Sequence, residues 1–124
     1  MNKPGRALEY VGHIVQAIER IEDYTADLSE QAFHADRLRQ DAVIRNLEVI
    51  GEASRNLDRY CPEFLVAYPD LPVIQAYEMR NALAHGYFRV DLQIIWETIQ
   101  NNLPPLHLRL VEVMNELNSA KRTP

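Results

Sequence analysis

The sequence has little of what disulfides, long loops and membrane spans require. Its 124 residues include four glycines and a single cysteine, Cys61, which excludes an internal disulfide and a zinc cluster built on cysteines. We expect Cys61 to be a partly buried apolar thiol. No apolar run approaches 18 residues, and no charged-then-apolar leader is seen. Neither a membrane span nor secretion is therefore expected, and the location that we predict is cytoplasmic.

Positive charge and metal-ligand patterns are also scarce. Thirteen Lys and Arg against 18 Asp and Glu give a net charge of −5, so no broad basic field exists to gather nucleic acid. Any phosphate contact must come from a few local arginines, and no DNA partner is expected. The histidines show no ligand spacing, so we expect no metal site; they are His13, His34, His85 and His107. Phosphate-loop, Ser-His-Asp and His-Glu-x-x-His signatures are absent.

Good helix formers dominate what remains. We expect one all-α domain over residues 1–124, with frayed ends at about 1–5 and 118–124. Apolar residues at three- and four-residue steps predict long helices over 6–28 and 36–59, and a last helical stretch from residue 92. A short helical segment over 63–67 and a helix over 71–84 complete an antiparallel bundle of four to five helices.

Several residues carry more specific expectations. Gly51, in the middle of the second helix, indicates close approach of another helix. Asp70 and Asp91 are expected N-caps. Pro104 follows Leu103 and is expected to kink or break the last helix there. The polar face of the second helix is expected to be solvated; it comprises Arg45, Asn46, Glu48, Glu52, Arg55 and Asn56. The last helix is expected to face the core through Leu92, Trp96, Ile99, Leu103, Leu106, Leu110, Val113 and Leu117.

Residues 78–88 contain the pattern Arg-x4-His-x-Tyr, formed by Arg80, His85 and Tyr87. Arg80 falls within an apolar arc of its expected helix, so it either extends its stem to water or lines a groove that receives an anion. Asn81 and His85 share the other face. Arg80 and His85 are about 140° apart on a regular helix. They converge only if the helix ends near Ala84 or if a second copy of the chain faces the first.

These residue types suit RNA cleavage without a metal. An imidazole such as that of His85 titrates near neutrality and can remove a proton from a ribose 2′-hydroxyl. A guanidinium such as that of Arg80 can hold a phosphate in a bidentate fork and stabilise its developing charge. Structural roles are the alternative: His85 as a cation at a helix end and Arg80 as a salt-bridge donor in an interface.

The stretch from Arg80 to Tyr87 resembles the Arg-x4-6-His signature of HEPN domains, in the Arg-x4-His-x-Tyr form of HepT-like toxins. Residues 41–53 are similar to the second-helix segment of that family, and residues 91–98 and 103–106 resemble its closing helix. The likeness covers about residues 41–106. Gln75-Ala76-Tyr77 departs from the family's usual approach to the motif, which affects the expected details of the groove.

The resemblance implies a homodimer that brings two motifs to a shared cleft. It implies a metal-independent endoribonuclease that cleaves RNA through Arg80 and His85, with Asn81 supporting the cleft. Such a protein would be the toxin of a type VII-like toxin–antitoxin system. The antitoxin would be a minimal nucleotidyltransferase (MNT-type) that uses ATP and Mg to transfer AMP to Tyr87, while the chain itself needs no cofactor. The alternative is a non-catalytic HEPN module that binds and positions the nucleotidyltransferase.

Overall fold

The computed structural model describes residues 4–72 and 91–122, and in these ranges every regular element is helical. Helix α1 is Pro4–Thr25, α2 is Glu30–His34, α3 is Arg37–Tyr60 and α4 is Pro62–Ala67. After residue 90 the chain forms α6 (Leu92–Glu97), the π-helix η1 (Thr98–Asn102) and α7 (Leu103–Arg122). The all-α prediction is confirmed.

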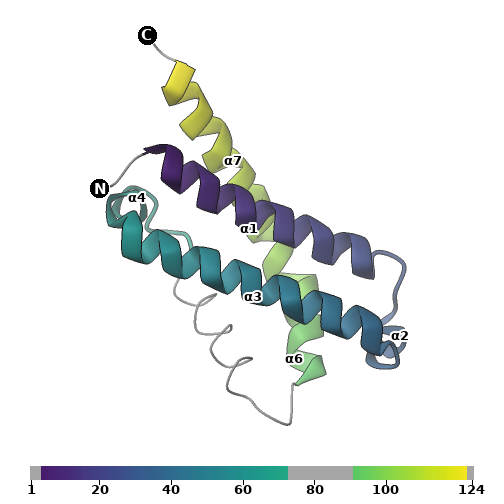
Figure 1. Cartoon of the computed structure of the whole chain (residues 1–124). Coiled ribbons are helices and arrows are strands. Elements are labelled where there is room, and N and C mark those ends of the chain that lie inside the picture. Colours follow the sequence, from purple (N-terminus) through teal and green to yellow (C-terminus); the bar gives the residue numbers. More distant parts are fainter. Residues whose placement is uncertain (1–3, 73–90, 123–124) are drawn as a thin grey trace.

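The two longest early helices form the base of the bundle. Helices α1 and α3 run antiparallel side by side, and α7 crosses behind α1 (Figure 1). Short connections with side-chain caps make this hairpin possible: Ser29 accepts from the N–H of Ala32 at 3.1 Å, and Asp36 accepts from that of Arg39 at 3.1 Å. These caps satisfy N–H groups that the first helical turn leaves unpaired.

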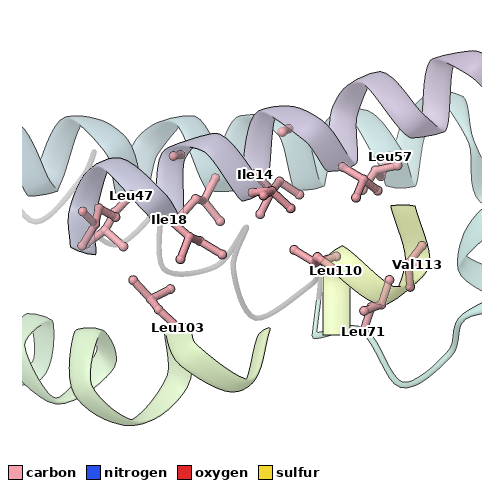
Figure 2. Packing of buried hydrophobic residues seen from close by; sticks show 14 of the residues in the cluster. Ile14, Ile18, Leu47, Leu57, Leu71, Leu103, Leu110 and Val113 are labelled. Carbon is pink, nitrogen blue, oxygen red and sulfur yellow. The ribbon is translucent and has the colours of Figure 1, made fainter. Parts of the chain in front are cut away.

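The predicted apolar stripe of the first helix lies in the core. Val11, Ile18 and Ile21 are each 0% exposed, and Ile14 is 2% exposed. Figure 2 shows Ile14 and Ile18 facing side chains of the C-terminal helices. Burying such a side chain stabilises the fold by roughly 1.5–3 kcal/mol. The helix itself ends at Thr25, three residues before the predicted end, where the Thr25 carbonyl accepts from the N–H of Leu28.

Helix α3 begins and ends within one residue of the prediction, but two of its side chains differ from it. Leu38, one of the apolar residues whose three- and four-residue steps predict this helix, is 79% exposed because it lies in the first turn. Asn46, expected on the solvated face, is buried, and its amide donates to the Ala42 carbonyl at 2.9 Å. Gly51 is buried as well.

Phe33 and Cys61 also lie in the core. Phe33, in α2, is 0% exposed and its ring lies 5.5 Å from that of Trp96. The thiol of Cys61 is buried, as expected, and this burial raises its pKa. The short helix predicted over 63–67 is α4, which begins one residue earlier, at Pro62.

The Pro104–Pro105 pair changes the last helix in a way that the sequence did not predict. Leu103 remains helical, with φ −71° and ψ −41°, and its N–H bonds to the carbonyl of Thr98, five residues back. The prolines fall in the first turn of α7, where a missing N–H costs little. The extra residue in the π-helical turn accommodates them without a break. At its other end α7 continues to Arg122, within the range expected to fray.

The π-helix also changes which residues of α6 face the core. Ile95, absent from the predicted seam, is 2% exposed, whereas Leu92 and Trp96 are only partly buried. One extra residue between α6 and α7 rotates α6 relative to the regular 3.6-residue period. The other seam residues follow the prediction: Ile99, Leu103, Leu110 and Val113 are buried, and Leu106 and Leu117 pack against them.

Candidate functional site

The predicted site residues Arg80, Asn81, His85 and Tyr87 lie in residues 73–90, outside the described residues. The helix predicted over 71–84 lies there from residue 73 onward, as does the connection after it, whereas Leu71 and Pro72 are described and are not helical. Their roles therefore stay predictions. The structure does define the residues at both ends of this stretch and the pocket beside its first end.

Residues 68–70, just before the stretch, are fastened to α7. The Nε of Arg109 donates to Oδ2 of Asp70 at 2.8 Å. The same guanidinium lies 5.6 Å from the centre of the Tyr68 ring. The hydroxyl of Tyr68 donates to Oε2 of Glu116 at 2.7 Å. Four side chains, two from this connection and two from α7, thus form a network that holds the residues just before Leu71, which is itself buried.

The network changes the pKa values of two of its members, Asp70 and Tyr68. The hydrogen bond from Arg109 lowers the pKa of Asp70 below its ordinary value. The pKa of Tyr68 is raised, chiefly because its hydroxyl donates to Glu116 and secondarily through desolvation. Both shifts follow from hydrogen bonding to one protonation state. Asp70 was expected to cap a helix; in the described residues its carboxylate is the acceptor of an arginine.

The residue after the stretch is also fixed. Asp91 caps α6, as predicted: its Oδ1 accepts from the N–H of Gln93 at 3.0 Å and from that of Ile94 at 3.3 Å. The extended backbone of Asp91 (φ −79°, ψ 99°) marks where the helix begins. The described residues that flank 73–90 are consequently held in place, Asp70 by its bond to α7 and Asp91 as the cap of α6.

A pocket of about 610 Å³ opens beside the first of these anchors. It lies among α3, the Asp70–Pro72 connection and the π-helical turn; its lining residues are Leu47, Ile50, Asp70, Leu71, Pro72, Thr98, Asn101, Asn102, Pro105, Leu106 and Arg109. Apolar walls with a few polar groups are typical of small-molecule sites, and the volume is in their range. The side-chain amides of Asn101 and Asn102 offer hydrogen-bond donors and acceptors to this pocket. Arg109 adds a guanidinium that is already paired with Asp70.

A second groove, of about 380 Å³, is lined by residues of α1 and α3: His13, Arg45, Glu48, Val49, Glu52, Ala53 and Asn56. Nη1 of Arg45 lies 3.9 Å from Oε2 of Glu48, a loose and exposed ion pair. Of the polar face of α3, Arg45, Glu52 and Arg55 are exposed as expected, Glu48 and Asn56 are partly buried, and Asn46 is buried. Within the described residues no group of three His, Cys, Asp or Glu could hold a metal ion. No described helix is long and apolar enough to cross a membrane.

Sequence reasoning missed the Arg109 network. Arg109 and Asp70 are 39 positions apart, and Tyr68 and Glu116 are 48 apart. No local pattern pairs residues at such separations. The only sequence signal was that Arg109 lies off the apolar seam of α7, next to Leu110.

Comparison with known proteins connects this frame to a family. Residues 14–113 match the family model described as "Ribonuclease HepT-like". The chain is 39% identical over 98 residues to a "Probable ribonuclease HepT" of Thermococcus cleftensis, with 79% of this chain and 86% of that protein covered.

A longer relative matches as well. The chain is 41% identical over 112 residues to a "Gamma-glutamylcyclotransferase and putative RNase" of Methanocaldococcus jannaschii. That match covers 90% of this chain, which spans 49% of the longer protein. Comparison with solved structures gave no significant match. On the strength of the family match across both anchors and the motif between them, the chain belongs to the HepT-like ribonuclease family.

Proposed function

We propose that the chain is a metal-independent endoribonuclease that acts as the toxin of a toxin–antitoxin pair. The observation that carries the proposal is the Arg-x4-His-x-Tyr motif, residues 80–87, within the HepT-like match over residues 14–113. The RNase names of the relatives support RNA as the substrate.

In the proposed reaction His85 removes the proton of a ribose 2′-hydroxyl. The 2′-oxygen attacks the adjacent phosphorus, the bond from phosphorus to the 5′-oxygen breaks, and that oxygen takes a proton from water. His85 then releases its own proton to solvent. The products are a 2′,3′-cyclic phosphate and a 5′-hydroxyl end. Arg80 binds the phosphate oxygens in a bidentate fork as their charge develops. Asn81 supports the cleft, and a second copy of the chain completes it.

The proposal makes no use of a bound cofactor. The nucleophile is the substrate's own hydroxyl and the developing charge is matched by a guanidinium, so neither a metal-bound water nor a metal Lewis acid is needed. DNA lacks the 2′-hydroxyl and should not be cleaved. Control of the toxin is proposed to run through Tyr87, which a nucleotidyltransferase antitoxin would modify with AMP from ATP.

Cleavage of mixed RNAs by the purified protein tests the reaction. The wild type should cleave RNA in EDTA as well as in Mg²⁺, leaving 2′,3′-cyclic phosphate ends. Arg80→Ala and His85→Ala should each abolish cleavage, and Arg80→Lys should restore little, because a point charge does not reproduce the fork.

Two results would decide against this mechanism. Activity that is lost in EDTA and restored by a divalent ion would refute the metal-free reaction. A wild-type protein that neither cleaves RNA nor arrests growth when expressed alone would favour the non-catalytic module that positions a nucleotidyltransferase.

A further inference from the structure

Helix α1 begins and α3 ends at the same end of the bundle (Figure 1). At this end two arginines, Arg6 and Arg59, lie against the ring of Tyr60. The Cζ of Arg6 lies 5.5 Å from the ring centre of Tyr60, and that of Arg59 lies 5.4 Å from it. Tyr60 is 38% exposed, and both arginines are exposed. We call Arg6, Arg59 and Tyr60 the Arg-Tyr-Arg cluster. It joins residues from two helices that are far apart in the sequence.

The charges of this cluster are not neutralised by ion pairs. Arg39, Arg45 and Arg109 each pair with a carboxylate. In the part of the chain that the structure describes, the guanidinium groups of Arg6 and Arg59 form neither an ion pair nor a hydrogen bond. A guanidinium on an aromatic face keeps its N–H donors available at the ring edge.

Such a cluster fits a single-stranded nucleic acid. Arginine binds phosphate oxygens in a fork, and the unstacked bases of a single strand can stack on guanidinium planes. The chain carries a net charge of −5, so attraction of a polyanion depends on local groups of this kind rather than on the overall field. Two cations that share one ring also hold a defined spacing, which two isolated surface arginines do not.

We propose that the Arg-Tyr-Arg cluster is a binding site for single-stranded RNA, in addition to the Arg80–His85 motif. The inference rests on the proposed function, since it supplies a second contact for the same substrate. Arg6 and Arg59 bind backbone phosphates, and Tyr60 holds the two guanidinium groups at a fixed spacing. The site adds affinity without reading sequence.

Binding of a fluorescent 2′-O-methyl oligonucleotide, followed by anisotropy, tests the site apart from cleavage, because this RNA has no free 2′-hydroxyl to attack phosphorus. The double variant Arg6→Ala with Arg59→Ala is compared with Arg20→Ala with Arg37→Ala. Arg20 and Arg37 are exposed and have no ion pair or ring contact in the described part of the chain, so both variants lose the same charge.

The cluster variant should raise Kd about tenfold or more, and the control variant less than about twofold. The slope of log K against log salt should fall by about 1.4 in the cluster variant, the value for two single-strand phosphate contacts. Tyr60→Phe should bind as the wild type, and Tyr60→Leu should bind more weakly. Equal thermal unfolding temperatures exclude a folding defect.

The outcomes separate this inference from the proposed reaction. Equal weakening in both double variants, or unchanged Kd in both, would overturn the cluster as an RNA site while leaving any observed cleavage intact. Cluster-dependent binding by a protein that cleaves no unmodified RNA would uphold the site and refute the proposed reaction. If polyglutamate competes at the cluster as well as RNA does, the site is a protein-docking surface and the inference fails.

Discussion

Arg109 donates through Nε to Oδ2 of Asp70 at 2.8 Å, and this bond ties the last helix to the connection that precedes residues 73–90. Both side chains are partly exposed, at 35% and 54%, so the bond is expected to matter more for geometry than for overall stability. The guanidinium of Arg109 also lies over the ring of Tyr68 and near the carboxylate of Glu116.

The first prediction concerns the pH dependence of this bond. The pKa of Asp70 is below its ordinary 3.8 in the folded chain. Asp70 therefore contributes stability that is present above pH 3.8 and is lost as the pH falls through the lowered value. Urea unfolding of Asp70→Asn should show less loss of stability than the wild type between pH 5 and pH 2. Asp58→Asn, at an exposed position on α3, is the control and should keep the wild-type dependence.

Packing of α3 gives a matched pair of leucines in one helix. Leu57 is 0% exposed and Leu38 is 79% exposed. Leu57→Ala should lower the free energy of unfolding by about 2–5 kcal/mol, because it leaves a cavity, whereas Leu38→Ala should change it by less than about 0.5 kcal/mol. Denaturant titration measures both. A comparable cost at Leu38 would mean that this side chain is covered in solution.

Asp91, the N-cap of α6, is predicted to help position the Arg80–Tyr87 motif, because it directly follows residues 73–90. Asp91→Ala removes the acceptor of two N–H groups and should cost about 1 kcal/mol of stability. Asp91→Asn and Asp91→Ser should retain most of it, since both side chains cap well. If cleavage needs residues 73–90 held at this end, Asp91→Ala should lower kcat more than KM. An unchanged kcat would show that the cap serves folding alone.

Modification of Tyr87 is predicted to silence the toxin. An added AMP brings phosphate charge two residues from His85, where Arg80 can pair with it and be lost to RNA. Co-expression with the cognate nucleotidyltransferase should add AMP mass to the peptide that contains Tyr87. Tyr87→Phe should resist silencing. A neutralised protein found unmodified, or modified elsewhere, by mass spectrometry would favour inhibition by complex formation.

A homodimer is the last prediction. Arg80 sits in an apolar arc of its expected helix with no obvious intrachain use for its charge, and two copies would bring two motifs together. An obligate interface of this kind typically buries more than roughly 2,000 Å². Light scattering at micromolar concentration should give twice the 14.4 kDa of one chain. A monomer would contradict the shared cleft.

Periodicity predicted the helices well because burial of one face leaves a direct trace in the sequence. Ile14, Ile18 and Leu57 are buried as their spacing required. The π-helix left no such trace: its extra residue moves Ile95 into the core, although the regular period favours Trp96. Both Ile95 and Trp96 are apolar and could have faced the core, and only the packing of the folded chain shows that Ile95 does.

In the candidate site, too, local features could be predicted from the sequence, and contacts between distant residues could not. Asp91 was found because a cap acts on N–H groups two and three residues away. Arg109 and the Arg-Tyr-Arg cluster were not found, since each joins residues that only the folded chain brings together. The motif itself was identified by resemblance rather than by physics, because Arg80 and His85 have ordinary structural uses on any helix.

The π-helical turn has a consequence for how relatives should be aligned. Removing one residue from 98–102 would restore a continuous α-helix without turning α6 about its axis, because the π-helical turn already holds that one extra residue. Ile95 would then lie seven residues before Leu103 instead of eight, and it would stay in the core. A relative that lacks one residue here should therefore keep an apolar side chain at the position of Ile95. Gaps of a single residue inside this helix are structural events, and an alignment that moves them into the nearest loop would pair the wrong side chains.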